Sequence, residues 1–317
     1  MKTSFCCTVF NEEKNIARFL DSLLAQSVPL DEIIIVDGGS RDKTVEIIRK
    51  YQQKSRVPIK LFIKKGANIA QGRNIALRNA RNEIIFSGDC GADFERDWVK
   101  KMLAGFRAGA EVVVGKYVPA KPFKNLTEET AAARMPDFDS FSEKDFQAFL
   151  PSNRQIAYKK SFWKKMGGCP EFIDRADDTL MHLNAKKMEV KYFFAKNARV
   201  YWHARSSLKE YLRLAFLDSK SDGVAGIVWM KRIYWIQFLF FAALVLFILM
   251  GIVFNHTYFL LSLAILFLIF ARELIRLFKK TRLVVAFYGA FIGVLLFLMH
   301  SAGGIAGILQ GFLKGSE

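Results

Sequence analysis

The sequence predicts an α/β fold with a mainly parallel sheet and flanking helices, followed by a C-terminal helical membrane segment. Two observations support this prediction. Short apolar segments alternate with amphipathic ones from residue 4 to residue 118, which is typical of βαβ units. Residues 1–232 hold 41 of the 47 Lys and Arg and 28 of the 30 Asp and Glu, so residues 233–317 hold only 6 and 2. We therefore expect a charged, water-facing body and an apolar membrane tail.

The expected elements follow in order along the body. Strands are expected at 4–10, 33–37, 59–63, 83–87 and 111–118, with a further strand just before His203. Helices are expected after an N-cap at Asn11 and at 43–54, 67–81 and 98–106, where apolar residues recur at helical spacing. Residues 152–168 indicate a short strand and then a helix that ends at Gly167 and Gly168.

Residues 119–151 are expected to be irregular, because they are rich in Pro, Phe and charge. A long segment of this kind in a compact domain is usually functional. We interpret it as a membrane-facing loop on the acceptor side, and a disordered excursion remains the alternative.

Two expected strands end in a carboxylate. Asp37 runs into Gly38, Gly39 and Ser40, and Asp89 lies in the segment Gly88-Asp89-Cys90-Gly91-Ala92-Asp93. The carboxyl ends of parallel strands meet at one edge of a sheet, where ligands bind in open α/β folds. Hard oxygen ligands at such an edge suit a nucleotide diphosphate with a divalent cation. An ordinary strand–turn–helix explains the glycines equally well.

Six segments together resemble glycosyltransferase family 2, whose members have the GT-A nucleotide-sugar fold. They are CTVFNEEKNIARFLDSLLAQSV, IIIVDGGSRDKT, GRNIALRNARNEIIFSGDCGADF, SNRQIAYKKSFWKKMGGCPEF, ADDTLMHLNAKK and VYWHARSSLKEY. The segments follow one another in the order that the family has, and the resemblance covers residues 5 to about 223. The resemblance implies a nucleotide-diphosphate-sugar donor and a Mg²⁺ or Mn²⁺ cofactor.

The resemblance also implies a donor site. Asp37 and the turn Gly38-Gly39-Ser40 would bind the nucleobase beside Thr8 and the segment Phe10-Asn11-Glu12. Arg73, Asn74, Cys90 and Arg205 would lie on the diphosphate side. Asp89 would begin the DXD metal motif, but Gly91 replaces its second carboxylate, as in an Asp-X-Gly variant. Asp93 and His203 are the candidates to complete the metal site. The alternatives are weaker metal binding that is partly through water, a helix cap before Trp98 for Asp93, and a phosphate contact for His203.

The pair Asp177-Asp178 stands where the family has an acidic pair, and the second acid of that pair is the general base. Transfer with inversion needs a carboxylate to take the proton of the acceptor hydroxyl. Asp178 is the candidate for that role, and Asp177 would pair with a basic residue or orient the helix. Without the resemblance, two acids at a helix N-terminus are explained by the helix dipole. His182, four residues later, is expected to be packed or solvated.

The chain is expected to comprise a GT-A domain at 1–206, an amphipathic interfacial helix and linker at 207–232, and a membrane region at 233–317. Spans are expected at 233–254, 257–275 and 283–313. Lys231, Arg232, Arg272, Arg276, Lys279, Lys280 and Arg282 flank the spans on one side and Lys314 on the other. This asymmetry predicts a multi-pass plasma-membrane protein with a cytosolic catalytic domain and an outside C-terminus.

Gly303, Gly307 and Gly311 recur every four residues and form a close-packing stripe for another helix. That helix belongs either to the same chain or to a second protomer in a homo-oligomer. A loosely packed re-entrant end is the third possibility.

The sequence therefore predicts a membrane-anchored, inverting glycosyltransferase that acts on a lipid-linked or cell-envelope glycan acceptor. The QxxRW motif of processive synthases is missing from the late part of the body, which favours the addition of one or a few sugars. The net charge of +17 could indicate nucleic acid, but no motif for nucleic acid is present. The body, with 41 basic and 28 acidic residues, carries +13, which fits anionic lipid head groups and an anionic substrate. The alternatives are a polyprenyl-phosphate sugar synthase and a catalytically silent, nucleotide-binding membrane scaffold.

Overall fold

The computed structural model describes residues 1–314 and divides the chain into two compact units. The first unit comprises residues 1–120 and 136–203, and the second comprises residues 121–135 and the chain from residue 204. Residues 121–135 were expected inside the first domain but group with the second unit. The reason is that their helix α5 (Leu126–Ala133) bonds to the C-terminal helices. The Thr127 and Tyr288 hydroxyls lie 2.9 Å apart, and Arg282 donates to Glu129 at 2.6 Å.

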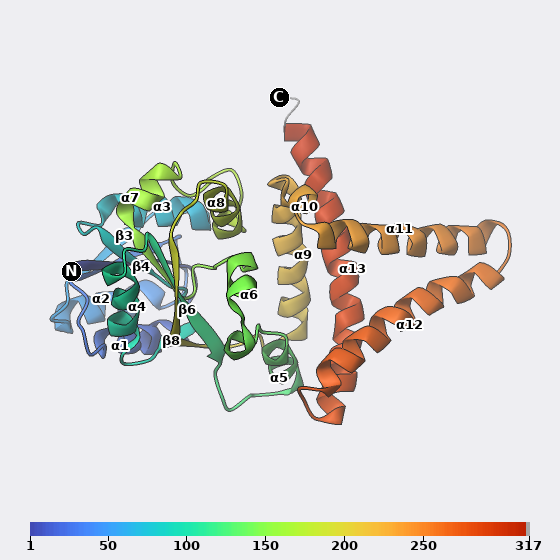
Figure 1. Cartoon of the computed structure of the whole chain (residues 1–317), viewed down its shortest axis with the longest axis horizontal. Coiled ribbons are helices and arrows are strands. Elements are labelled where there is room, and N and C mark those ends of the chain that lie inside the picture. The colour runs from blue at the N-terminus through green and yellow to red at the C-terminus, as the bar shows by residue number, and fades with distance from the viewer. Residues whose placement is uncertain (315–317) are drawn as a thin grey trace. The chain divides into compact units, whose positions relative to one another are not determined.

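The described first unit contains a mixed, mainly parallel sheet with flanking helices, as predicted (Figure 1). Its eight strands lie in the order β3-β2-β1-β4-β7-β6-β8-β5. Strands β3, β2, β1 and β4 are mutually parallel, β7 runs antiparallel to both of its neighbours, and β6 pairs with β8 in parallel. The strands are β1 (Thr3–Val9), β2 (Glu32–Asp37), β3 (Ile59–Ile63), β4 (Ile84–Ser87), β5 (Ala92–Phe94), β6 (Val112–Pro119), β7 (Ile156–Lys159) and β8 (Tyr192–Trp202). The parallel half brings the carboxyl ends of β2 and β4 to one edge, where Asp37 and Asp89 lie.

The helices of the first unit are α1 (Ile16–Leu24), α2 (Thr44–Lys54), α3 (Ile69–Asn79), α4 (Trp98–Arg107), η1 (Phe138–Ser140), α6 (Glu143–Ala148), α7 (Lys160–Lys165) and α8 (Asp177–Lys186). Two expectations were wrong. Asn11 does not cap α1, because it adopts a φ of 53° in the preceding turn. Residues 119–151 are not irregular throughout, since α5, η1 and α6 lie within them. Their low apolar periodicity hid these short helices.

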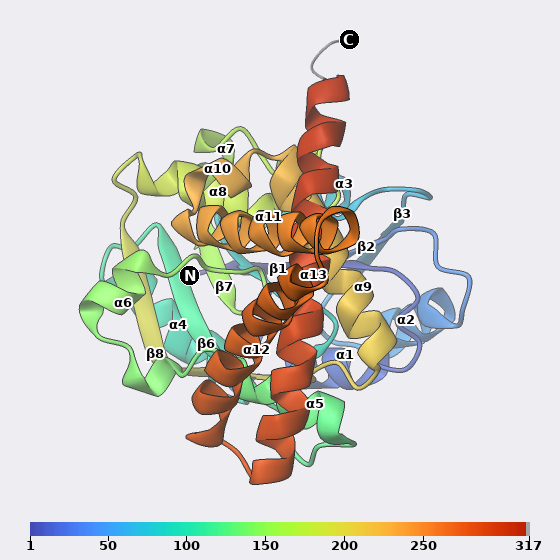
Figure 2. The ribbon, with the colours of Figure 1, turned by 90° about the vertical axis from the view of Figure 1, so that its right-hand side faces the viewer.

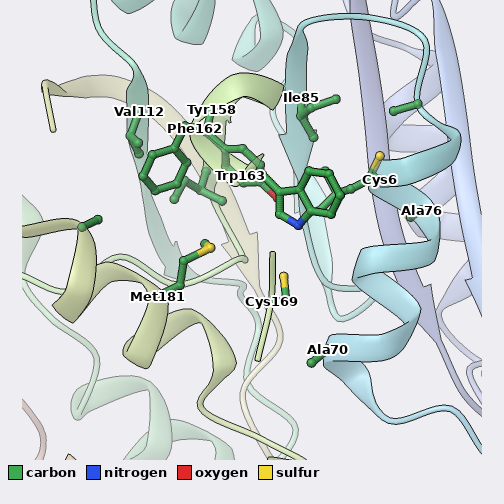
Figure 3. Packing of buried hydrophobic residues seen from close by; sticks show 14 of the residues in the cluster. Cys6, Ala70, Ala76, Ile85, Val112, Tyr158, Phe162, Trp163, Cys169 and Met181 are labelled. Carbon is green, nitrogen blue, oxygen red and sulfur yellow. The ribbon is translucent and has the colours of Figure 1, made fainter. Parts of the chain in front are cut away.

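One core cluster of the first unit lies where the strands of the sheet pack against α3, α7 and α8 (Figure 3). Tyr158 and Phe162 are fully buried there, and Cys6 and Ala76 pack in the same cluster. The helices α1 and α4 bury further apolar residues such as Phe19 and Trp98. All four cysteines are buried and free, and burial raises the pKa of the Cys7 thiol. Such thiols pack as small apolar side chains.

The second unit consists of α5 and the C-terminal helices. These are α9 (Leu208–Val224), α10 (Ile227–Met230), α11 (Arg232–Val253), α12 (Thr257–Phe278) and α13 (Leu283–Lys314). Three of the described helices, α11, α12 and α13, are long and apolar enough to cross a membrane. Lys314 is the cation predicted on the far side of the spans, and its side chain lies outside what the structure describes.

The glycine stripe of α13 is covered by α9 of the same chain (Figure 2). A Cβ on Gly307 would lie 2.0 Å from the carbonyl oxygen of Lys220, and one on Gly303 would lie 2.3 Å from that of Phe216. The glycines therefore let two backbones touch. The internal alternative is correct, and the stripe is not an open face for a homo-oligomer.

Candidate functional site

Asp37 closes the turn at the end of β2. Its Oδ1 accepts hydrogen bonds from the backbone N–H groups of Gly39 and Ser40, both at 2.8 Å, and its Oδ2 accepts one from the Ser40 hydroxyl. The side chain is fully buried. Gly39 has a φ of 95°, which an L side chain rarely adopts. The carboxylate thus builds the turn, and its contact with a nucleobase stays a prediction.

The segment that follows β1 lies beside this turn. Asn11 donates its N–H to the Ser40 hydroxyl at 2.8 Å, and its side chain accepts the N–H of Arg41 at 2.9 Å. Glu12 donates its N–H to the Thr44 hydroxyl at 2.7 Å. The ring of Phe10 is 57% exposed and borders Gly38. The turn and this segment therefore form one surface, on which Phe10 offers an apolar face.

Thr8 occupies the last part of β1, where α3 approaches the sheet. A Cβ on Gly72 would lie 2.5 Å from the Thr8 methyl group, so only glycine allows this approach. The close packing places the first turn of α3, and with it Arg73, at the carboxyl edge of the parallel strands.

Arg73 connects the two acidic parts of the site. Its Nη1 donates to both carboxylate oxygens of Asp177, each at 2.6 Å, and its Nη2 donates to Asp89 at 3.3 Å. Arg73 therefore holds the start of α8 next to the end of β4, although these residues lie far apart in the sequence. The expected pairing of Asp177 with a basic residue is present.

Burial acts on both partners of this ion pair. It raises the pKa of the Asp177 carboxyl, and Arg73 opposes that rise. Burial alone would lower the pKa of Arg73, but Asp177, Asp89 and Asp178 outweigh it and raise the pKa. A guanidinium stays protonated in proteins and bonds both oxygens of Asp177, so we treat Asp177 as ionised.

Asp178 is held by backbone donors at the start of α8. Its Oδ1 accepts the N–H of Thr179 at 2.8 Å, and its Oδ2 accepts the N–H of Asn153 at 3.1 Å. Unlike Asp177, it is only partly buried. An oriented carboxylate that is partly open to solvent can accept a proton from a hydroxyl group.

Sequence reasoning missed two residues beside these acids, Asn153 and Arg154. Asn153 is buried, and its side-chain Oδ1 and Nδ2 have no partner among the described residues. Such a group is rare, because an unbonded buried amide is costly. The guanidinium of Arg154 lies 4.2 Å from the ring centroid of Trp202, and its Nε lies 3.9 Å from Asp89. The only available signal was a polar SNRQ run before an apolar strand.

The three predicted metal ligands do not form a cluster. His203 Nε2 and Asp93 Oδ2 lie 2.8 Å apart, and Arg18 Nε donates to Asp93 Oδ1 at 2.7 Å. Asp89 faces Arg73 and Arg154 instead. Within residues 1–314, no group of three or more His, Cys, Asp and Glu side chains is placed to hold a metal. A site in which all three residues hold the ion therefore does not fit this structure, and Asp93, which lies in β5, is not a helix cap either.

Three further predicted donor-site residues have other surroundings. Asn74 accepts from Trp163 Nε1 at 3.0 Å and from the N–H of Cys169 at 2.8 Å, and it donates to the Cys169 carbonyl at 2.9 Å. Its amide thus ties α3 to the segment after α7, and its contact with the diphosphate stays a prediction. Cys90 is buried. Arg205 belongs to the second unit, where it lies 3.6 Å from Glu210.

His182 is packed, as expected. It is fully buried, and its Nδ1 lies 2.8 Å from the Tyr192 hydroxyl. Burial lowers the pKa of His182 to about 4, so the ring is neutral near pH 7.

Comparisons with known proteins identify the relatives of this chain. A family model described as "Glycosyl transferase family 2" matches residues 4–167. The poly(ribitol-phosphate) beta-N-acetylglucosaminyltransferase TarS of Staphylococcus aureus is 24% identical over 233 residues, which are 69% of this chain and 38% of TarS. The O-antigen chain rhamnosyltransferase RfbN of Salmonella typhimurium is 24% identical over 204 residues, which are 61% of this chain and 62% of RfbN. The chain thus spans less than two thirds of the length of these relatives.

Solved structures share the fold. TarS residues 1–349 in complex with UDP superpose with a TM-score of 0.50 at 21% identity, covering 69% of this chain and 64% of that one. The mannosyltransferase PcManGT of Pyrobaculum calidifontis, in complex with GDP-Man and Mn²⁺, has a TM-score of 0.60 at 16% identity and covers 99% of this chain and 87% of its own. At these identities the likeness establishes a GT-A-like fold.

Proposed function

Since the chain belongs to glycosyl transferase family 2, we propose that this glycosyltransferase inverts the anomeric centre of a nucleotide-diphosphate sugar. The acceptor is a lipid-linked or cell-envelope glycan at the cytosolic face of the plasma membrane. The observation that carries the proposal is the convergence of Asp89 and Asp177 on Arg73, with Asp178 next in the chain.

In the proposed reaction, Asp178 takes the proton of the acceptor hydroxyl while that oxygen attacks the anomeric carbon. The bond from this carbon to the diphosphate oxygen breaks on the opposite face, and its electron pair leaves with the nucleotide. Hydrogen bonds from Asn153 and Thr179 orient the Asp178 carboxylate for this step. Arg73 and Arg154, beside Asp89, supply positive charge for the leaving diphosphate.

The nucleobase is proposed to bind over the turn Gly38-Gly39-Ser40, against the exposed ring of Phe10. Asp37 supports this surface by closing the turn. A divalent cation, Mg²⁺ or Mn²⁺, is proposed to enter with the donor diphosphate and to meet Asp89 as a protein carboxylate. The cation would neutralise negative charge on the phosphates. The proton transfer to Asp178 and the exchange of bonds at the anomeric carbon do not pass through the cation.

Membrane association is supported by the apolar helices α11, α12 and α13. The cationic residues around α11 and α12 favour a cytosolic position for the first unit, where nucleotide sugars are found. Three crossings with an outside C-terminus are one topology that these helices allow. A hairpin that returns the chain to the cytosolic side is the other.

Asp178→Asn tests the proposed base. The variant should bind UDP-, GDP- or dTDP-sugar as the parent does in calorimetry, and it should lose about 10²–10⁴-fold of its transfer rate. Asp174→Asn, an exposed acid four residues earlier, is the matched control and should keep the parent rate. Undiminished transfer by Asp178→Asn would remove the assignment.

The same variant separates the alternatives. A polyprenyl-phosphate acceptor is already largely ionised at pH 7 and needs no base, so Asp178→Asn would lose much less activity on it. If the protein is a silent scaffold, even the unmutated protein would bind a nucleotide sugar without releasing the nucleotide from it.

A further inference from the structure

The helices α9 and α13 form a pair along most of their length. Ala215 of α9 packs with Ile292 and Leu296 of α13, and this cluster is surrounded by Leu208, Tyr211 and Leu212 from α9 and Tyr288 from α13. Farther along, the Ser219 hydroxyl donates to the His300 carbonyl at 2.6 Å, and Lys220 lies against Gly307. Because the two backbones touch, α9 must lie at the same depth in a membrane as α13.

The outer face of α9 is charged. Its exposed residues are Lys209, Glu210, Arg213 and Asp218. Arg213 and Asp218 lie level with the middle of α13, since their neighbours Ala215 and Ser219 contact residues 292–300. If α13 crossed the bilayer along its axis, these two exposed charges would lie in hydrocarbon, which is strongly unfavourable.

The open apolar surface of α13 is a stripe. Its exposed large apolar residues are Leu283, Val284, Phe287, Phe291, Ile305, Leu309, Phe312 and Leu313. At about 100° per residue they fall within about 120° of arc, on the side away from the glycines that meet α9. In α11, by contrast, the exposed apolar residues surround the helix; they include Ile233, Trp235, Leu239, Val245, Ile248 and Leu249. A stripe is typical of a helix that lies in the interface, and a full apolar circumference is typical of a span.

The helices α11 and α12 form a hairpin that contacts α13 near its open end, here called the base, and extends away from the α9–α13 pair. In α11, Gln237 donates to the Ser301 hydroxyl of α13 at 3.1 Å, and Phe241 contacts Phe297 of α13. In α12, Phe270 contacts Phe287, nearer the start of α13. Figures 1 and 2 show α11 running across α13 and away from it. Helices α11 and α13 therefore cannot both lie along the membrane normal.

Charge separates the base of the hairpin from its tip. The base carries Lys231, Arg232, Arg272, Arg276, Lys279, Lys280 and Arg282. The tip, Phe254-Asn255-His256, has no Lys, Arg, Asp or Glu. Each arm has 22 residues, and at about 1.5 Å per residue an arm reaches across a hydrocarbon core of about 30 Å. The base suits anionic head groups, and the tip can pass to the far side.

We propose that α11 and α12 alone cross the bilayer, as a hairpin, and that α13 lies in the membrane surface with its apolar stripe in the lipid. α9 then lies on the water side of α13 with its charges solvated. The C-terminus returns to the side of the first unit, which replaces the three crossings expected from hydropathy. This topology depends on the second unit alone and holds whether or not the proposed reaction is correct.

Labelling of one introduced cysteine at a time in the full chain, in intact spheroplasts, tests this topology. The natural cysteines are buried, and the parent protein measures their background. With a membrane-impermeant maleimide, Thr257→Cys at the tip should label in intact spheroplasts. Lys54→Cys in the first unit, Asp218→Cys in α9 and Lys314→Cys at the C-terminal end should label only after permeabilisation.

Three results would overturn the proposal. Labelling of Lys314→Cys in intact spheroplasts would mean that α13 crosses. Failure of Thr257→Cys to label in intact spheroplasts would mean that the hairpin does not cross. Protection of Asp218→Cys even after permeabilisation would place α9 in hydrocarbon.

Spin-label depth measurements provide a second readout on the purified protein in bilayers. Phe287→Cys, Phe291→Cys and Leu309→Cys should report one shallow depth along α13, whereas Val245→Cys should lie deepest. A depth for Phe291→Cys far below that of Phe287→Cys would contradict the surface position. Variants that leave the membrane fraction or lose the parent elution volume are replaced by Val284→Cys and Ile305→Cys on the same stripe.

Discussion

At the residue scale, Arg73 is the side chain on which the acids of the first unit converge. It bonds both oxygens of Asp177 and reaches Asp89, and both ends of the Arg73–Asp177 pair are buried. Removing one partner of such a pair leaves a charge with neither water nor a counter-ion. Arg73 therefore stabilises the first unit and also positions the start of α8 for the proposed chemistry.

Arg73→Lys should separate geometry from charge. Lysine keeps the charge but lacks the planar guanidinium, whose Nη1 meets Asp177 while its Nη2 reaches Asp89. We expect a free energy of unfolding lower by about 3 kcal/mol and a transfer rate lower by at least about tenfold. Thermal unfolding in detergent and a donor-turnover assay measure the two effects.

The matched control is Arg78→Lys on the same helix, whose ion pair with Glu171 is largely exposed at 3.6 Å. It should change stability by no more than about 0.5 kcal/mol. Equal effects of the two substitutions would show that the guanidinium of Arg73 contributes no more to stability than that of Arg78.

His182 makes stability depend on pH. Its folded pKa is lowered to about 4 by burial, against about 6.5 in the unfolded chain. The unfolded state therefore binds the proton first, and stability should be lost as the pH falls from about 6.5 to about 4. The loss is about 3 kcal/mol, from about 1.4 kcal/mol per pKa unit.

His182→Phe should flatten this dependence. Equilibrium unfolding between pH 4 and pH 7 should show a smaller slope than the parent, even if the lost bond to Tyr192 lowers stability at every pH. An unchanged slope would mean that other groups cause the acid sensitivity.

At the element scale, the pairing of α9 with α13 depends on particular glycines. A Cβ at position 307 would lie 2.0 Å from a carbonyl oxygen, whereas at position 311 its nearest neighbours are 3.7 Å away. Gly307→Ala should therefore lower the free energy of unfolding by about 1–3 kcal/mol through overpacking. Gly311→Ala should be neutral or slightly stabilising, because alanine favours the helix.

Thermal unfolding of both variants in the same detergent provides the comparison. If Gly307→Ala and Gly311→Ala behave alike, the close approach of α9 does not contribute to stability.

At the scale of the whole molecule, the boundary between the units is not a single point in the sequence. The helix α5 comes from the middle of the first unit, yet Arg134 beside it pairs with Glu273 at 2.8 Å and donates to the Gly289 carbonyl at 2.9 Å. Truncation after residue 206 would leave these groups without their partners. We expect the truncated protein to aggregate or to unfold at a lower temperature than the full chain.

A second truncated variant, with residues 121–135 replaced by a short Gly/Ser linker, should recover solubility, because it removes the stranded helix. Size-exclusion chromatography and thermal unfolding compare the two. If the simple truncation at 206 is as soluble and stable as the linker variant, α5 does not need the second unit.

The local patterns of the chain were sufficient to predict the alternation of strands and helices, the apolar tail, and the position of two strand-end aspartates at one sheet edge. Each of these follows from local periodicity and from the parallel arrangement that βαβ units impose. The family resemblance added the acidic pair at the start of α8, and the pairing of Asp177 with a basic residue is present in the structure.

Only the tertiary structure revealed which side chains meet. The Asn74 amide bonds to Trp163 and Cys169 within the protein. Asp93 bonds to His203, whereas Asp89 faces Arg73. Asn153 and Arg154 carried almost no signal, because a polar residue beside a strand looks the same whether it is solvated or buried. Hydropathy likewise reports how apolar a helix is and not what covers it. The glycines of α13 and the charges of α9 acquire their meaning only when the two helices lie side by side.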